Sequence, residues 1–160
     1  MIESFRPNAG SIVFNYARKV LVCERIDIRN AWQFPQGGIE ENETPAEAAI
    51  RELYEETSLS LNDVTLIKTL DAPIRYHFPH DIVLKMQKRG FDNSGQDIFW
   101  SLFFMHGNES AINLQTQYPE FKSFRWVDIS EACDLIVDFK KNAYQVAKNN
   151  FESLIINFPI

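Results

Sequence analysis

GGIEENETPAEAAIRELYEETSL, residues 37 to 59, is the most informative segment of this 160-residue chain. Thr44 has a side chain able to cap a helix, Pro45 suits the first helical position, and Glu47 stands three residues after the cap. These signals predict a helix from Pro45 to about Thr57. Its apolar residues recur at helical spacing and form the stripe expected to be buried: Ala46, Ala49, Ile50 and Leu53.

Three glutamates crowd one face of this helix. Glu52, Glu55 and Glu56 are spaced i, i+3 and i+4, so they project on the same side, roughly opposite the stripe of Ala49 and Leu53. Exposed like charges at this spacing repel by about 0.2–0.5 kcal/mol per pair. A solvated acidic surface is the ordinary explanation of such a run. Mg²⁺ offers another, because it takes carboxylate oxygens as ligands.

The residues around the three glutamates favour the metal site. Gly37 and Gly38 allow a sharp backbone turn before the helix and close packing against it. Arg51 could pair with Glu43 and fix this loop against the helix. The simpler alternative for Arg51 is a surface salt bridge, which stabilises little.

The segment resembles the Nudix box, which reads glycine, five residues, Glu, seven residues, then Arg-Glu-aliphatic-x-Glu-Glu-x-Gly-aliphatic. The positions in register are Gly37, Glu43, Arg51, Glu52, Leu53, Glu55, Glu56 and Leu59. One position departs, because Ser58 stands where the motif has its second glycine. A left-handed backbone is common after a helix, and serine in that conformation would cost on the order of 1 kcal/mol.

This resemblance implies an α/β protein of the Nudix fold, an α/β/α sandwich with a mixed sheet, formed by residues 1–160 as one domain. It implies hydrolysis of a nucleoside diphosphate linked to another moiety, with Mg²⁺, Mn²⁺ or another divalent cation as cofactor. The implied metal site consists of Gly37, Glu52, Glu55, Glu56 and Glu120. The four glutamates would be catalytic, and the residues that shape the motif would be Gly38, Glu43 and Arg51. A bound cation neutralises phosphate oxygens and activates a water for in-line attack, while a carboxylate takes the proton.

Segments outside the box resemble the bacterial branch of RNA pyrophosphohydrolases and dinucleoside polyphosphate hydrolases. They are Arg6-Pro7-Asn8-Ala9-Gly10, Trp32-Gln33-Phe34-Pro35-Gln36-Gly37-Gly38-Ile39, Pro119-Glu120-Phe121, Arg125-Trp126-Val127 and Asp138-Phe139-Lys140. In that branch, RNA with a 5′-triphosphate loses pyrophosphate, and close relatives cleave dinucleoside tetra- or pentaphosphates. The resemblance places Glu120 near the metals as a ligand or general base, whereas the alternative is a solvent-facing loop glutamate.

The same resemblance implies substrate contacts near both ends of the chain. Arg6 would contact a phosphate, since guanidinium groups suit oxyanions, and a salt bridge is an equally good interpretation. Phe139 would stack on a base or pack in the core, and Lys140 would contact a base or a phosphate. Gln36 would line the pocket or serve as a turn residue. Arg25 is a weaker phosphate candidate, from its strand position alone.

Strands are predicted from β-branched and aromatic content at Ser11–Tyr16, Lys19–Glu24, Trp32–Pro35, Val64–Leu70, Ile98–His106 and Phe121–Val127. Ser130–Asp134 is expected to start a short helix, and Asp138–Phe151 to form an amphipathic one. The stretch from Asp71 to about Gly95 is predicted to be an irregular, functional loop. Strands mixed with helices indicate a mixed sheet with a helix on each face.

Charge limits the possible partners. The chain has 22 acidic and 16 basic residues, a net charge of −6, which argues against general binding to nucleic acid but leaves room for a small basic pocket. A local basic cluster, Lys85, Lys88 and Arg89, could guide an RNA backbone, although a solvated loop is the simpler interpretation. No metal-ligand arrangement is visible in the histidines, and ordinary roles are expected for His77, His80 and His106.

The remaining features indicate a cytoplasmic protein. Cys23 and Cys133 are far apart and lack CxxC spacing, which predicts buried free thiols in a reducing compartment. The first residues lack a basic region followed by an apolar stretch, so no signal peptide is expected. The most apolar run, Ile98–Met105, is too short to span a membrane and suits a buried strand. We expect no membrane contact and a monomer.

Three functions stay open at this point. The first is hydrolysis of triphosphorylated RNA 5′ ends, and the second is hydrolysis of small dinucleoside polyphosphates. Both would use the same metal centre, and they differ in whether a basic surface extends past the nucleotide pocket. The third is a catalytically silent module that binds a nucleotide or a partner. Glu52, Glu55 and Glu56 speak against it, because a silent module has no chemical need for three crowded carboxylates.

Overall fold

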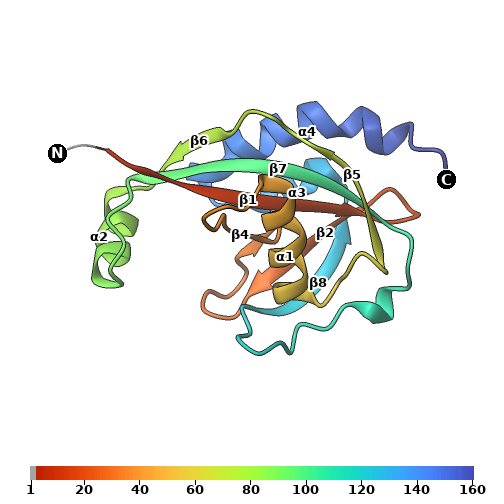
Figure 1. Ribbon diagram of the computed structural model, residues 1–160, viewed down its shortest axis with the longest axis horizontal. Helices are drawn as coiled ribbons and strands as arrows, with labels where there is room; N and C mark the ends of the chain where they lie inside the picture. The colour runs from red at the N-terminus through yellow and green to blue at the C-terminus, as the bar shows by residue number, and fades with distance from the viewer. Residues whose placement is uncertain (1–2) are drawn as a thin grey trace.

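The protein contains an eight-stranded sheet with helices on both faces (Figure 1), as described for residues 3–160 by a computed structural model. The strands are Phe5–Phe14 (β1), Val20–Arg25 (β2), Trp32–Gln33 (β3), Gln36–Gly38 (β4), Val64–Thr69 (β5), Ile74–His77 (β6), Gly95–Met105 (β7) and Phe121–Val127 (β8). The helices are Pro45–Thr57 (α1), His80–Lys88 (α2), Ile129–Leu135 (α3) and Lys141–Ile156 (α4). Short 3-10 turns cover Glu109–Ala111 and Asp138–Lys140.

The sheet is mixed. Its main path runs β3-β2-β1-β7-β5, with β4 paired to β1, β6 to β7 and β8 to β2. The long central strands β1 and β7 are parallel, from Phe5 opposite Gly95 to Phe14 opposite Phe104, and the other pairs are antiparallel. These two strands cross the molecule side by side (Figure 1) and give the outer elements a common support.

Side chains that alternate along β1 supply two separate cores. Ile12 and Phe14 belong to a core shared with α3 and α4, which contribute residues such as Tyr144 and Phe151. Ala9 and Val13 belong to a second core on the opposite face, shared with α1. One helix layer therefore covers each face of the sheet, and the predicted α/β/α sandwich with a mixed sheet is confirmed.

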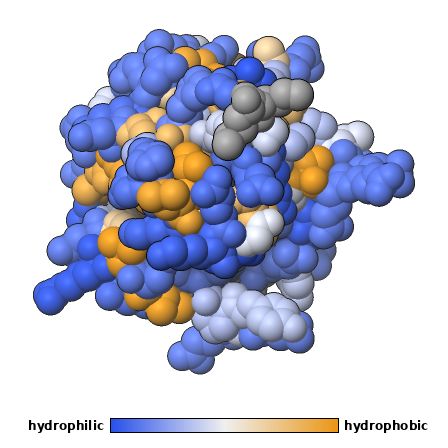
Figure 2. All heavy atoms as spheres, turned by 90° about the vertical axis from the view of Figure 1, so that its left-hand side faces the viewer, coloured by the Kyte–Doolittle hydropathy of each residue, from blue (hydrophilic) through white to orange (hydrophobic). Residues whose placement is uncertain are grey.

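The segment predicted to be irregular, from Asp71 to about Gly95, contains β6 and the helix α2, so that prediction is wrong. Proline lacks a backbone donor, which favours a position at or before a helix start, and Pro79 occupies the N-cap of α2. The helix has no buried residue, and Leu84 is 46% exposed. It lies at one end of the molecule, where Figure 2 shows apolar patches set among polar side chains. The apolar residues Ile82, Val83 and Met86 do recur at helical spacing. The prolines and charges of the segment nevertheless favour a loop, whereas Pro79 stands at the start of a helix.

Other boundaries also differ from expectation. Residues 36 to 38 form the short strand β4 rather than only a turn, because their backbone pairs with Asn8, Ala9 and Gly10 of β1. The C-terminal helix begins at Lys141, after a 3-10 turn, and continues past Phe151 to Ile156, since Ile155 is also buried against the core. No helix within residues 3–160 has the length and apolar character needed to cross a membrane. In this part of the chain, both cysteines are buried free thiols.

Candidate active site

Both ends of α1 are fixed by local contacts. The backbone N–H of Glu47 donates to Thr44 Oγ1 at 3.1 Å, and the Thr44 N–H donates to Glu47 Oε1 at 3.0 Å, so the predicted capping box is present. At the other end, Ser58 has φ +70°, the left-handed conformation that the motif glycine would adopt freely. Ser58 Oγ also donates to the carbonyl oxygen of Asn113 at 2.8 Å, a contact that glycine could not make.

Arg51 joins the helix to the loop before it. Its Nε and Nη2 donate to the two carboxylate oxygens of Glu43 at 2.7 and 2.8 Å, so the expected pairing is confirmed. This bidentate contact lowers the pKa of Glu43 to about 2. The same guanidinium donates to the Gly38 carbonyl at 2.9 Å and to Glu52 Oε1 at 2.8 Å. Arg51 therefore sets the position of both the glycine segment and the first glutamate of the trio.

Gly37 leaves room for the Glu52 carboxylate. A Cβ atom at residue 37 would lie 2.0 Å from Glu52 Cδ and 2.2 Å from its Oε2, well inside the van der Waals limit. Pairing between β4 and β1 holds the backbone of Gly37 opposite Ala9. A glycine is required here because a carboxylate occupies the space of its missing side chain.

The three helix glutamates differ in their surroundings. Glu55 is exposed and Glu52 is partly buried, but Glu56 is only 4% exposed. The expectation of a face directed away from the core is therefore wrong for Glu56. It fails because the neighbouring strands and the loop before β8 enclose this end of the helix, with Glu120 at the base of that loop. A simple solvated acidic face is excluded for this residue.

Glu56 is a buried carboxylate without partners. Neither of its oxygens has hydrogen-bond geometry with a partner within the described residues 3–160, although the Gln36 backbone and the Glu120 carboxyl group lie close by. Burial, and then repulsion from the carboxylates of Glu120 and Glu52, raises the pKa of Glu56 well above its ordinary value. Burial likewise raises the pKa of Glu52, against the opposing effect of Arg51. The mutual repulsion shows that Glu52, Glu56 and Glu120 converge, although they come from two distant segments.

A cavity of about 550 Å³ lies beside these carboxylates. Its lining includes the three converging glutamates and four basic residues: Arg6, Arg25, Arg89 and Lys140. A cavity lined by both carboxylates and basic side chains suits a polyanion, which the carboxylates would bind through a cation and the basic side chains would bind directly. Volumes of this size are typical of small-molecule sites.

Gln36 and Lys140 belong to a polar network that lines part of this cavity. Gln36 Nε2 donates to Asn8 Oδ1 at 3.1 Å and to Gln96 Oε1 at 3.2 Å, and its Oε1 accepts from Lys140 Nζ at 3.5 Å. The Tyr76 hydroxyl donates to Gln96 as well. Burial, and then the nearby charge of Arg25, lowers the pKa of Lys140 to about 8. The network positions the Lys140 ammonium at the cavity rather than in the solvent.

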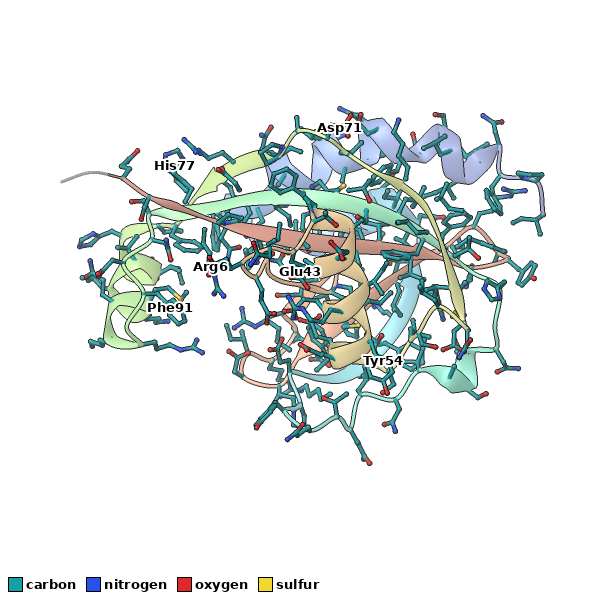
Figure 3. All side chains as sticks on the ribbon, in the orientation of Figure 1. Arg6, Glu43, Tyr54, Asp71, His77 and Phe91 are labelled. Atoms are coloured by element: carbon teal, nitrogen blue, oxygen red, sulfur yellow. The ribbon has the colours of Figure 1, made fainter. Side chains whose placement is uncertain are left out.

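Of the other predicted substrate contacts, Arg6 and Arg25 line the cavity and Phe139 does not. Arg6 lines the cavity with its guanidinium 5.3 Å from the centre of the Phe91 ring, and it points into the space between α1 and α2 (Figure 3). Arg25 also lines it but is held by Asp27 through contacts of 2.9 and 2.5 Å. Phe139 is absent from this lining, and its ring packs near Tyr76. This position favours the core-packing interpretation, and stacking of Phe139 on a base stays a prediction.

Several cavity residues were not found from the sequence. Arg89 belongs to the basic cluster for which a solvated loop was the simpler interpretation, yet it lines the cavity from just beyond the end of α2. Asn8 lies on β1 and Gln96 on the paired strand β7. Gln96 is two residues from Ile98, the residue opposite Asn8. Their polar character in otherwise apolar strands was the available signal.

Comparison with known proteins agrees with this arrangement. Residues 4–149 match the NUDIX domain family. The chain is also 36% identical over 151 residues to the RNA pyrophosphohydrolase of Pelagibacter ubique, covering 94% of this chain and 93% of the relative.

The chain belongs to the Nudix family. Solved Nudix structures share the fold: the dihydroneopterin triphosphate pyrophosphohydrolase of E. coli has a TM-score of 0.68 at 19% identity and covers 97% of this chain and 99% of its own. An Ap4A hydrolase of C. elegans has a TM-score of 0.65 at 15% identity, covering 94% of this chain and 99% of that one. The resemblance stated from the Nudix box is therefore confirmed.

Nudix hydrolases generally use divalent cations, and the residues of this chain fit one. Within residues 3–160, no three acidic, histidine or cysteine side chains form a tight, preformed metal cluster. Yet Glu56 is a buried carboxylate with unpartnered oxygens, and Glu52 and Glu120 repel it across a shared cavity. A cation would supply the missing partner and remove this repulsion, and carboxylates that repel each other are expected to stand apart without it. Electrostatics and burial thus indicate the site more directly than the spacing does.

Proposed function

We propose that this protein is a Mg²⁺-dependent RNA 5′-pyrophosphohydrolase, which converts a 5′-triphosphate end to a 5′-monophosphate and releases pyrophosphate. The observation that carries this proposal is the cavity whose lining combines three glutamates, Glu52, Glu56 and Glu120, with four basic residues. The identity of 36% to an RNA pyrophosphohydrolase over 94% of the chain supports the choice of substrate.

Different residues of the cavity would bind different parts of the substrate. Arg6 and Lys140 would contact the phosphates, since a guanidinium and an ammonium group suit oxyanions. Arg89 also lines the cavity and would contact further phosphates of an RNA, whereas Arg25 lines it as an ion pair with Asp27. Gln36 would hold Lys140 in place and line the pocket.

The glutamates would serve the chemical step. Glu52 and Glu56 would hold the cation together with Glu55 and the carbonyl of Gly37, and Glu120 would be either a further ligand or the general base. When bound, Mg²⁺ neutralises phosphate oxygens and makes water a better nucleophile. The water oxygen forms a bond to phosphorus while the anhydride P–O bond breaks, and the released proton passes to a carboxylate. Glu120 suits that last role, because it is exposed at the edge of the cavity and can pass the proton to solvent.

Further aspects of the setting belong to the same proposal. The match to the NUDIX domain family over residues 4–149 supports a single domain. The buried free thiols of Cys23 and Cys133 suit a reducing cytoplasm.

The proposal is tested by hydrolysis of a 5′-triphosphorylated RNA of about ten nucleotides, long enough to extend past the phosphate pocket. Release of pyrophosphate and formation of a 5′-monophosphate end are measured with Mg²⁺ and with EDTA. We expect activity only with the cation, and a loss of about 100-fold or more in kcat for Glu56→Gln. Glu41→Gln, an exposed substitution in the loop before α1, is the matched control.

Two outcomes would contradict the proposal. Full hydrolysis by Glu56→Gln at saturating Mg²⁺ would remove Glu56 from the metal site. A kcat/KM on diadenosine tetraphosphate much higher than that on the RNA would make the protein a dinucleoside polyphosphate hydrolase instead. That alternative has a structural observation in its favour, which is a second cavity of about 560 Å³ that shares Glu52, Glu56 and Glu120 with the first.

A further inference from the structure

Ser58 is the one position of the Nudix box at which this chain departs from the motif, and it directly follows the helix that carries the metal-site glutamates. Its backbone has φ +70°, a strained conformation for serine that glycine adopts freely. A serine that keeps this strain should have a side chain with a role of its own. The side chain of Ser58 does make a contact, because its Oγ donates to the Asn113 carbonyl at 2.8 Å.

Asn113 receives contacts from three directions. Its carbonyl oxygen accepts from Ser58, its backbone N–H donates to the Thr57 carbonyl at 2.9 Å, and its Oδ1 accepts from the Gln115 N–H at 3.0 Å. The first two contacts join Asn113 to the end of α1, and the third turns the chain that follows. Leu114 packs beside them on the core shared with α1. This part of the chain therefore stays near the helix, and the hydroxyl contact adds to its direction.

The segment from Asn113 to Glu120 is held by hydrogen bonds near its two ends. At the far end, just before β8, the Glu120 carbonyl accepts from the Ile26 N–H at 3.0 Å. Between the ends, Thr116 Oγ1 is buried and has no hydrogen-bond partner within residues 3–160, and Tyr118 is 79% exposed. Because neither side chain hydrogen-bonds the segment to the rest of this described part, its course depends on the two ends.

The segment carries Glu120 and forms a wall beside Glu56. Ser58, Thr116 and Glu120 line the second cavity together with Glu56, so the anchored wall and the acidic centre border one space. The two carboxylates are near enough for the charge of Glu120 to raise the pKa of Glu56. Like charges move apart unless the backbone that carries them is held. The contact of Ser58 with Asn113 supplies part of that hold.

We propose that Ser58 is a positioning residue for Glu120: through Asn113 it holds the segment that ends at Glu120 against α1, and so keeps this carboxylate beside Glu56. The inference rests on the proposed function, in which Glu120 is a further metal ligand or the general base. A displacement of a catalytic group by about 1 Å costs about 100-fold in rate, so partial loosening of the segment should cost less.

The first test measures kcat and KM on 5′-triphosphorylated RNA with Mg²⁺ in Ser58→Gly, which restores the motif residue. Glycine removes both the contact and the strain of the positive φ, so the unfolding temperature should change little. We expect kcat to fall about 5- to 10-fold, the equivalent of one hydrogen bond, while KM stays the same. A residue that served folding alone would show altered stability and an unchanged kcat.

Two further variants separate this role from a general effect of substitution. In a Glu120→Gln background, Ser58→Gly should cause no further loss of kcat, because Ser58 acts through Glu120. Asn108→Ala is the matched control. Asn108 Oδ1 accepts from the Ser110 N–H at 2.8 Å, the same kind of contact that Asn113 makes, but in the preceding turn of the chain. We expect Asn108→Ala to keep the kcat of the unmodified protein.

Hydrogen exchange of backbone amides, measured without metal, gives a readout independent of turnover. Ser58→Gly should speed exchange of the Asn113 and Gln115 N–H groups about 5- to 10-fold, whereas Asn108→Ala should leave it unchanged. Unchanged exchange or an unchanged kcat in Ser58→Gly, or the same loss of kcat in the Glu120→Gln background, would overturn the inference. Failure of the proposed function is distinct, because the unmodified protein would then release no pyrophosphate from the RNA.

Discussion

Replacing Gly37 by alanine should disable the proposed metal site, because the added atom collides with a carboxylate and not with the backbone. The added Cβ would lie 2.0 Å from Glu52 Cδ, about 1.4 Å short of the 3.4 Å at which ordinary contact begins. Glu52 cannot simply rotate away, because its Oε1 accepts from Arg51 at 2.8 Å. The carboxylate must therefore shift by about 1 Å, and such a displacement of a catalytic group costs about 100-fold in rate.

The expected result for Gly37→Ala is a fall of about 100-fold in kcat/KM on triphosphorylated RNA. We also expect a rise of about 10- to 100-fold in the Mg²⁺ concentration that gives half-maximal activity. Stability should fall by only about 1–3 kcal/mol, the usual effect of overpacking. Gly37 does not have a positive φ, so alanine adds no left-handed strain.

Gly38→Ala is the matched control for this substitution. Its Cβ would meet only the end of the flexible Arg6 side chain, at 2.4 Å from Nη2, and that side chain can move. We expect a modest rise in KM and an unchanged requirement for Mg²⁺. A Gly37→Ala protein with the kcat and Mg²⁺ dependence of the unmodified protein would refute the role given to Glu52. So would equal changes in Mg²⁺ dependence in the two variants.

Three further predictions follow from the same contacts. Because the pKa of Glu56 is raised, the metal-free protein should lose about 1.4 kcal/mol of unfolding free energy per pH unit as the pH rises from the ordinary value of 4.5 toward the raised one. Urea unfolding in EDTA should show this slope removed in Glu56→Gln, and an unchanged slope would contradict the burial argument. Lys140, with a pKa of about 8, should lose its charge above that pH, so the KM for RNA should rise there. The KM of Lys140→Arg should stay low, because arginine keeps its charge. Parallel pH profiles of KM in the two proteins would exclude a phosphate contact. Ser58→Ala, which loses the Asn113 contact and keeps the positive φ, should unfold at a lower temperature than Ser58→Gly by the equivalent of about 1 kcal/mol. The reverse order would show that φ +70° is not retained in solution.

The helix that carries the site could be predicted because its signals are local. Thr44, Pro45 and Glu47 act within one turn, and the observed helix begins and ends at the residues expected, Pro45 and Thr57. The prediction of the buried stripe was less accurate. Ala48, which was not predicted, is fully buried, whereas Ala46 and Ile50 of the predicted stripe are only partly buried. Helical spacing gives the direction of a side chain but not the position of the strands that cover it.

The basic and polar residues that line the cavity could not be predicted from local patterns, because they come from segments that are far apart in the sequence. Arg89 reaches the cavity because α2 and β6 connect β5 to β7 along one end of the sheet. Gln36 and Gln96 meet because β4 and β7 both pair with β1. Each contact requires knowledge of strand order, whereas local patterns such as a helix cap require a few neighbouring residues only.

The burial of Glu56 gives a reason to regard the acidic centre as functional that does not depend on the Nudix motif. An unpaired buried carboxylate, close to two other carboxylates, destabilises a folded protein, and glutamine would remove the charge at nearly constant volume. A purely structural helix would gain stability from that change and lose nothing. The charge is useful only if something positive enters the site, and the two cavities that meet at Glu56 allow a polyphosphate to approach such a cation from either side. The cost in stability and the access to the site therefore point to the same position in the fold.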